Sequence, residues 1–302
     1  MNKRDFIKKS AAGMLATTLL PNITFARQNN VKITILHTND MHSHIHPFKS
    51  GRNKGLGGIA ERANIIKEIR SKEEYVLLLD AGDIFQGTPY FNFYGGELEF
   101  KLMSEMRYDA ATIGNHDFDN GLRGFKKQLI HANFPFLIAN YDFTNTILQD
   151  YFKPYKIFNK GGVRIGVLGI GIELNGLVPK SLYGRTKYID PIRQANYYAA
   201  ILKDKEKCDL IICLSHLGFK YKTKKMSDMI LARQSRNIDL IIGGHTHTFL
   251  KEPAKQNNLD GNQVLINQVG WAGINIGQID FHFSRNHTKK YFKTRSIFVK
   301  KK

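Results

Sequence analysis

Short apolar runs alternate with helical patterns through most of the chain. Runs rich in Val, Ile and Leu are typical of buried strands, and we expect strands at residues 31–36, 75–79, 110–113, 134–139, 163–170, 210–214 and 240–242. Apolar residues spaced three and four apart predict helices at residues 59–70, 98–106, 122–132, 191–205 and 226–236. The alternation of strands and helices indicates an α/β fold.

The pattern changes after Val264, where strands and turns replace the helices. Residues 274–283 and 291–299 predict two strands joined by a polar turn at residues 284–290. Together with the earlier strands, they predict two packed mixed sheets with helices outside. We therefore expect a four-layer α/β/β/α sandwich.

The first 26 residues have the pattern of an export signal. Basic residues at positions 3–9 precede a short apolar stretch at 11–20, and residues 24–26 offer a cleavage site. The start of this segment resembles a twin-arginine signal, with Lys3 in place of the first arginine. We expect a periplasmic or otherwise extracytoplasmic bacterial protein. No later apolar run approaches the ~20 residues that span a bilayer, so we expect no stable membrane span after signal removal.

Composition and charge restrict the possible domain organisation and binding partners only in part. The chain has 302 residues and 42% hydrophobic content, which fits one large domain, expected at residues 27–302. Its formal net charge of +19 suits nucleic acid, anionic surfaces or phosphorylated substrates. Basic residues are scattered, apart from residues 220–225 and 300–302, so we expect no direct nucleic-acid binding. Cys208 and Cys213 are expected to be buried thiols.

Polar side chains that can bind metals follow five of the expected strands. They are Asp40 and His42, then Asp83, then Asn115 and His116, then His216, and finally His245 and His247. In open α/β sheets, catalytic groups gather at the carboxyl ends of the strands. One such group would fit an ordinary turn, but five groups at equivalent positions favour a shared site.

Residues 112–121 combine an amide, an imidazole and two carboxylates in one short stretch. Asn115 offers a carbonyl oxygen to a metal, His116 can hold or give a proton, and the Asp119 carboxylate can orient the imidazole. Taken alone, this stretch also fits a turn between a strand and a helix, because Asn, Asp and Gly satisfy turn backbones.

The expected ligands are oxygens and imidazole nitrogens without thiolate. This mixture suits Zn, Mn, Fe or similar divalent ions, held as a pair about 3.5–4 Å apart. We therefore expect two divalent metal ions as cofactors.

The motifs and their order resemble those of the calcineurin-like metallophosphatases. They are Asp40-x-His42, Gly82-Asp83, Gly114-Asn115-His116-Asp117, Ser215-His216 and Gly243-Gly244-His245-x-His247. Residues 36–40, 83–88 and 115–119 narrow the resemblance to the N-terminal catalytic domain of bacterial 5'-nucleotidases. It implies a hydrolase of phosphate monoesters, with 5'-nucleotides as the first expectation, that works by in-line attack of a metal-bridging hydroxide. The export signal leads us to expect this hydrolase outside the cytoplasm.

The resemblance also implies a role for each metal ligand. One ion would be held by Asp40, His42 and His247 and the other by Asn115, His216 and His245, with Asp83 bridging the two.

It implies further that His116 stabilises the phosphoryl transition state or assists the leaving group, oriented by Asp119. Asp117 would support the site without binding metal. Asp80, His44 and His46 have no place in the motifs, and we expect them in turns or on the surface.

Relatives of this branch usually carry a second, C-terminal domain that binds the nucleoside, and we expect none in this chain. A separately encoded domain of that type could dock over the site. Two other functions stay open: hydrolysis of another ester, as in the thiosulfohydrolases that resemble this family, and a non-catalytic metal-binding subunit that docks on a partner.

Overall fold

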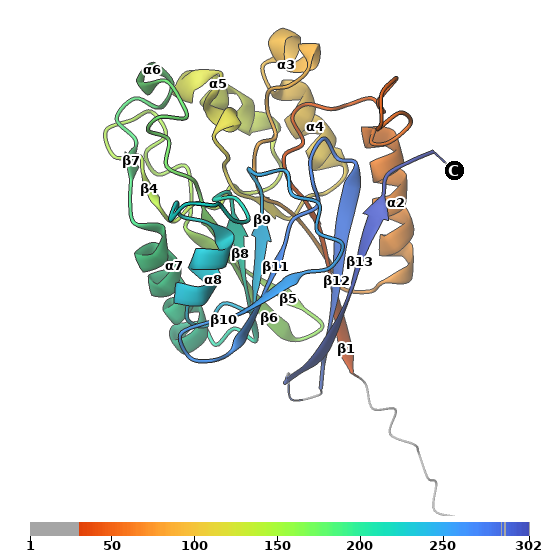
Figure 1. Ribbon diagram of the computed structural model, residues 1–302, viewed down its shortest axis with the longest axis vertical. Helices are drawn as coiled ribbons and strands as arrows, with labels where there is room; N and C mark the ends of the chain where they lie inside the picture. The colour runs from red at the N-terminus through yellow and green to blue at the C-terminus, as the bar shows by residue number, and fades with distance from the viewer. Residues whose placement is uncertain (1–29, 285, 287, 302) are drawn as a thin grey trace, which may run out of the picture. The chain divides into compact units, whose positions relative to one another are not determined.

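Two β-sheets pack face to face at the centre of the protein (Figure 1). In spatial order, sheet 1 consists of β13 (Lys289–Phe298), β12 (Asn275–Phe283), β1 (Val31–Thr38), β2 (Val76–Asp80) and β3 (Ala110–Ala111). Sheet 2 consists of β10 (Ala254–Asn257), β11 (Gln263–Asn267), β9 (Leu240–Gly243), β8 (Leu210–Ser215), β6 (Val163–Ile170) and β5 (Tyr155–Lys160). Both sheets mix parallel and antiparallel pairs.

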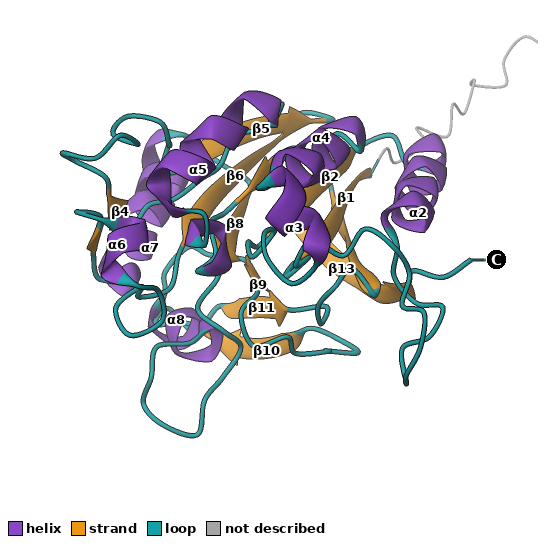
Figure 2. Ribbon diagram, turned by 90° about the horizontal axis from the view of Figure 1, so that it is seen from above, coloured by secondary structure: helices purple, strands orange, loops and turns teal. Residues whose placement is uncertain are grey.

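Helices cover the outer face of each sheet, and Figure 2 shows α4 and α5 on one side of the strands and α8 on the other. The helices on sheet 1 are α2 (Ile59–Lys72), α3 (Pro89–Tyr94), α4 (Glu97–Glu105) and α5 (Gly121–Gln128). Those on sheet 2 are α7 (Pro191–Ala200), which continues as a π-helical turn (Ile201–Lys205), and α8 (Asp228–Gln234). The expected four-layer α/β/β/α sandwich is confirmed.

Smaller elements complete the described chain. The strands β4 (Tyr141–Asp142) and β7 (Lys187–Tyr188) form a separate pair, next to the short helix α6 (Lys180–Tyr183). Two 3-10 turns, His116–Phe118 and Leu129–His131, lie before and after α5.

Alternation along the central strands produces three apolar layers. In β1, Ile35 points between the two sheets while its neighbour Leu36 points towards the helices of sheet 1. In β8, Ile212 points between the sheets while Cys213 points towards α7 and α8. Successive side chains of a strand face opposite sides, so strands buried on both faces must be apolar throughout.

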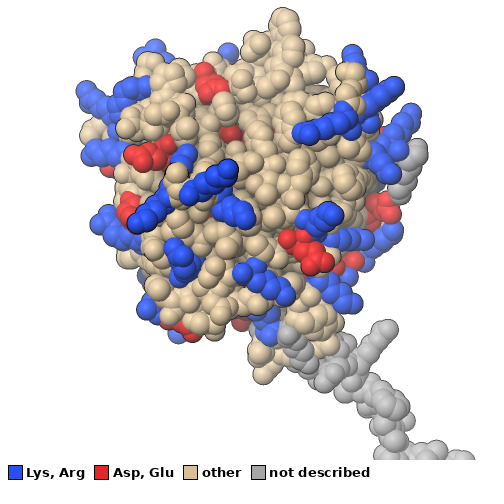
Figure 3. Space-filling view, viewed as in Figure 1, with Lys and Arg blue, Asp and Glu red and all other residues tan. Residues whose placement is uncertain are grey.

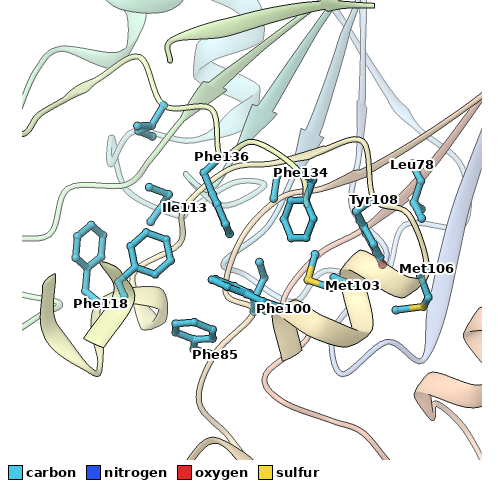
Figure 4. Packing of buried hydrophobic residues seen from close by; sticks show 14 of the residues in the cluster. Leu78, Phe85, Phe100, Met103, Met106, Tyr108, Ile113, Phe118, Phe134 and Phe136 are labelled. Atoms are coloured by element: carbon cyan, nitrogen blue, oxygen red, sulfur yellow. The ribbon is translucent and has the colours of Figure 1, made fainter. Parts of the chain in front are cut away.

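Aromatic rings fill the layer between sheet 1 and its helices (Figure 4). The ring of Phe85 stacks on that of Phe100 in α4, with centroids 4.8 Å apart, and meets Phe125 of α5 edge-on. Burying one such ring contributes about 1.5–3 kcal/mol. Because Phe85 lies two residues after Asp83, this packing holds the loop after β2 against the core.

One expected strand is absent. Residues 134–139 form only isolated bridges, Ala111 with Phe136 and Leu137 with Lys153. The N–H of Leu137 bonds to Ala111 of sheet 1, whereas the N–H of Ala139 bonds to Gly169 of sheet 2. This segment joins the two sheets and forms no continuous ladder with either.

The computed structural model describes residues 30–284, 286 and 288–301. The expected export signal, residues 1–26, lies outside these residues. Cys208 and Cys213 are both buried and form no disulfide, as expected. Among the described helices, none combines the length and apolar character needed to cross a membrane.

Candidate metal centre

The loops after β1, β2, β3, β8 and β9 meet at one end of the two sheets. The strands β1, β2 and β3 run parallel within sheet 1, and β8 and β9 run parallel within sheet 2. Their carboxyl ends therefore point the same way within each sheet. Hydrogen bonds join the loops across the sheets: the N–H of His245 donates to both carboxylate oxygens of Asp40, at 2.9 and 3.0 Å.

Asp40, His42 and His247 form one group whose candidate ligand atoms lie within 4.8 Å of one another. The Nε2 atoms of the two imidazoles are 2.9 Å apart, and His247 Nε2 is 3.3 Å from Asp40 Oδ1. Asp40 and His42 are buried, whereas the His247 side chain is 39% exposed. The group therefore opens to solvent on the His247 side.

Asp83, His216 and His245 form a second group of the same kind. His216 Nε2 lies 3.0 Å from Asp83 Oδ2, and His245 Nδ1 lies 2.8 Å from the side-chain oxygen of Asn115. His42 Nε2 is 3.9 Å from Asp83 Oδ2. Asp83 thus belongs to the second group and also lies close to the first, and all seven residues expected as metal ligands converge in one place.

The second group fits a cation. His216 is fully buried, and its Nδ1 lies 2.6 Å from the carbonyl oxygen of Ala81, so Nδ1 carries the proton that it donates. Its Nε2 faces the Asp83 carboxylate but has no hydrogen-bond partner among the described residues. A neutral imidazole would place a lone pair against this carboxylate, so the pair needs a proton or a metal ion between its members.

Charge around this pair points to the same conclusion. Burial alone would lower the pKa of His216, but the Asp83 carboxylate raises it to about 10. Burial would raise the pKa of Asp83, but the charges of His216 and His42 hold it below its ordinary value. The Asp83 carboxylate thus favours a positive charge at His216 Nε2, which either a proton or a metal ion can supply.

The backbone is strained where the ligands lie. Five of the seven candidate ligands have positive φ angles: Asp40 (50°), His42 (47°), Asp83 (56°), His245 (72°) and His247 (50°). Such residues are uncommon outside glycine, and they cluster at functional sites. In this conformation the chain folds back sharply, which lets ligands on neighbouring residues reach one point.

Two glycines allow the loops to approach so closely. A Cβ atom on Gly114 would overlap the carboxylate and backbone nitrogen of Asp83, and one on Gly244 would lie 2.7 Å from His216 Nδ1. Side-chain atoms at these positions would push two candidate ligands out of place. The glycines next to Asn115 and His245 therefore have a steric role.

Asp117 binds the backbone of two loops that carry candidate ligands. Its buried carboxylate accepts four backbone N–H bonds, from Asp83, Ile84, Phe85 and Gly114, at 2.8–3.1 Å. Burial raises its pKa to about 7, and the charge of Asp83 adds to this effect. Asp117 thus ties the loop after β2 to the loop after β3.

His116 and Asp119 form a pair at the opening of the site. His116 Nδ1 lies 2.8 Å from Asp119 Oδ2, and the His116 side chain is 38% exposed. This contact raises the pKa of His116, against the effect of burial. The His116 ring lies 5.3 Å from the His42 ring, and its backbone N–H donates to Asp83 Oδ1 at 2.8 Å. The imidazole of His116 therefore lies next to the candidate metal-binding residues, and its exposed edge can contact a molecule bound at the site.

Three residues outside the motifs behave differently from one another. Asp80 was expected in a turn or on the surface, and it is not on the surface. Its carboxylate is fully buried and accepts bonds from the Thr38 hydroxyl and from the Gly82 N–H of the turn that follows. His46 is exposed. His44 packs its ring on Phe48, at 5.0 Å.

Sequence reasoning missed two neighbours of the site. Trp271 lies flat against His247, and the buried carboxyl of Asp228 accepts a bond from the Ser215 hydroxyl next to His216. Both residues belong to parts of the chain without a metal-binding motif. No local pattern marks them, because only the packing of distant segments brings them here.

Comparisons with known proteins agree with this geometry. Residues 33–249 match the calcineurin-like phosphoesterase family. The snake venom 5'-nucleotidase of Crotalus adamanteus is 36% identical, with 83% of this chain and 45% of that protein covered. The 5'-nucleotidase of Vibrio cholerae is 36% identical, with 78% of this chain and 44% of that protein covered.

Similarity in structure extends over nearly the whole described chain. The 5'-nucleotidase precursor of Thermus thermophilus has a TM-score of 0.79 at 30% identity, and the match covers 89% of this chain and 55% of that one. The chain therefore spans about half the length of these relatives.

Proposed function

Because this chain belongs to the calcineurin-like phosphoesterase family, we propose that it hydrolyses phosphate monoesters with two bound metal ions and that 5'-nucleotides are its substrates. The convergence of two metal-binding groups beside the His116–Asp119 pair carries this proposal. The named 5'-nucleotidases among its relatives support the choice of substrate.

In this proposal, Asp40, His42 and His247 hold one divalent ion and Asn115, His216 and His245 hold the other, with Asp83 between them. Zn, Mn or Fe suits these oxygen and imidazole donors. Such a pair of ions, when bound, lowers the pKa of a water and neutralises charge on phosphoryl oxygens.

His116 is the proposed catalytic residue of the chain itself. Asp119 accepts a hydrogen bond from the Nδ1–H of His116, so Nε2 is the atom that meets the substrate. The raised pKa of His116 favours the protonated ring, which can stabilise charge on the phosphoryl group or give its proton to the leaving oxygen. A purely structural metal site would need neither residue, which argues against a non-catalytic subunit.

Replacement of Asp83 by Asn tests the metal chemistry. We expect hydrolysis of AMP and of a simple aryl phosphate to be abolished, because Asp83 belongs to both proposed ion sites. The exposed Asp204→Asn is the matched control and should keep full activity. Near-full activity of the Asp83 variant at saturating metal would contradict the proposal. A substrate screen that includes sugar phosphates, cyclic nucleotides and sulfur esters tests the alternative of another ester.

Recognition of the nucleoside needs contacts away from phosphorus. We propose that a separately encoded domain of the C-terminal type docks over the site and supplies them. The protein alone should then show little preference for AMP over an aryl phosphate. A preference of about a hundredfold in kcat/KM, equivalent to about 2.7 kcal/mol, would remove the need for such a partner.

We also propose an extracytoplasmic location, on the pattern of residues 1–26. Cell fractionation should then find the mature protein outside the cytoplasm. Replacement of Lys3 and Arg4 by Gln should block export if the twin-arginine route is used, and continued export of that variant would indicate the general secretory route.

A further inference from the structure

The loop of residues 219–227, which we call the lysine loop, carries four lysines and no acidic residue. Lys220, Lys222, Lys224 and Lys225 are all exposed, and none forms an ion pair with a carboxylate in the part of the chain that the structure describes. Basic side chains stand out on the face of the protein that carries α8, which directly follows this loop (Figure 3). The proposed reaction leaves this cluster without a role.

The base of the lysine loop is attached to the metal-binding motifs at both ends. The N–H of Phe219 donates to the hydroxyl of Thr246, at 2.9 Å, and Thr246 lies between His245 and His247. The N–H of Asp228 donates to the carbonyl of Gly218, two residues after His216, at 2.8 Å. Both ends of the loop therefore lie next to residues that flank the candidate ligands His216 and His245.

Tyr221 holds part of the loop in position. Its hydroxyl donates to the carbonyl of Leu217 at 2.7 Å, and the Lys225 ammonium lies 4.7 Å from the centre of its ring. A cation over an aromatic face is attracted to the ring, so this contact favours one placement of the ammonium. Leu217 directly follows His216, so these contacts join the Lys225 ammonium to the second metal-binding group.

We propose that the lysine loop is a second anion subsite, which binds the phosphate groups of a nucleoside diphosphate or triphosphate next to the phosphoryl group that reacts. Unpaired ammonium groups beside a phosphate-binding centre attract and hold further negative charge. The inference rests on the proposed function, because it places the reacting phosphate at the metal centre.

The reaction at such a substrate has a defined balance. The oxygen of water bonds to the terminal phosphorus, and the bond from that phosphorus to the bridging oxygen breaks. The bridging oxygen keeps the electron pair of that bond and leaves with the shortened nucleotide, inorganic phosphate is released, and the attacking water gives up a proton to the solvent. The lysines form no bond; they neutralise charge on the phosphates that remain with the nucleoside.

The test compares ADP with AMP in two variants that each lose three positive charges. One variant changes Lys222, Lys224 and Lys225 to Gln. The control changes Lys203, Lys205 and Lys207 to Gln; these exposed residues precede β8 and lie at the amino end of that strand, away from the metal centre. Thermal unfolding of both variants confirms that they fold.

The ratio of kcat/KM for ADP to that for AMP should fall at least about tenfold in the lysine-loop variant at low ionic strength and less than about twofold in the control. An equal fall in both variants would show a general effect of net charge and would overturn the proposal. An unchanged ratio in the lysine-loop variant would overturn it as well.

Binding separates this inference from the proposed reaction. Titration calorimetry with ADP and with AMP measures the same preference without turnover. If the wild-type protein hydrolyses neither nucleotide, the proposed function fails, but a preference for ADP that the lysine-loop variant loses would still support the subsite. Equal affinity of wild-type and variant proteins for ADP would exclude it.

Discussion

The indole ring of Trp271 lies parallel to the imidazole ring of His247, with an interplanar angle of 4° and ring centroids 5.6 Å apart. The rings of His44 and Phe48 meet the indole edge-on, at 5.2 and 5.7 Å. This packing orients a proposed metal ligand. Trp271 is also the single tryptophan of the chain, so its fluorescence reports on the surroundings of His247.

Metal binding should therefore change the emission of Trp271. We expect Mn²⁺ to quench this emission in a saturable manner and a chelator to restore it. His247→Ala should remove most of the effect, whereas His131→Ala, on the distant turn after α5, should leave it unchanged. A titration that is the same in the His247 variant and the wild type would exclude the proposed site.

His116→Asn should separate catalysis from metal binding. The imidazole contacts Asp119 and is not among the proposed ligands, so we expect metal content to stay intact while kcat falls by roughly 10²–10⁴. Elemental analysis together with steady-state kinetics measures both quantities. A parallel loss of metal would make His116 a ligand instead.

Gly114→Ala should displace Asp83. The added methyl group would overlap the Asp83 carboxylate, so we expect loss of metal and of activity while the fold is kept. Gly176→Ala is the control, because nothing lies within 4 Å of its added Cβ and the residue is exposed, so its positive φ (80°) strains the backbone without displacing a ligand. Normal metal affinity in the Gly114 variant would show that the loop can relax at little cost.

Asp117→Asn should loosen the two loops that it joins. An amide offers one acceptor oxygen and points an NH₂ group at backbone N–H donors, so we expect the free energy of unfolding to fall by about 1.5–3 kcal/mol. Metal affinity should fall with it. Denaturant unfolding measures the loss, with the exposed Asp150→Asn as the control. Unchanged stability would mean that the four N–H groups find other acceptors.

His37 should make the protein sensitive to acid. This residue of β1 is fully buried, and its Nε2 accepts a bond from the Asn267 side chain. Burial lowers its pKa from 6.5 to about 3. The unfolded chain therefore binds a proton that the folded chain does not, and the stability is complete above pH 6.5 and is lost as the pH falls towards 3.

The slope of the unfolding free energy against pH checks this prediction. His37 should contribute up to about 1.4 kcal/mol per pH unit within that window, and His37→Asn should reduce the slope by this amount even if its absolute stability is lower. Identical slopes would assign the acid sensitivity to other groups.

Several features could be predicted from local sequence alone. The expected strand at residues 163–170 coincides with β6, and the α2 helix begins at Ile59 as expected. The failure at residues 134–139 has a tertiary cause. Apolar periodicity reports burial, but the side chains of this segment enter all three apolar layers and its backbone bonds to both sheets without a ladder to either. The partly buried edge strand β5 was missed because its pattern lacks a continuous apolar run.

The sequence by itself determined which chemistry this protein can offer, because the ligand types, the glycines beside them and the turns after each strand are properties of neighbouring residues. Only the tertiary structure decided the geometry. The His245 N–H bonds to Asp40 across 205 positions of chain, and the positive φ angles of both residues persist because the packed sheets hold their loops. A distance across two sheets depends on how the whole core packs, and no local pattern encodes it.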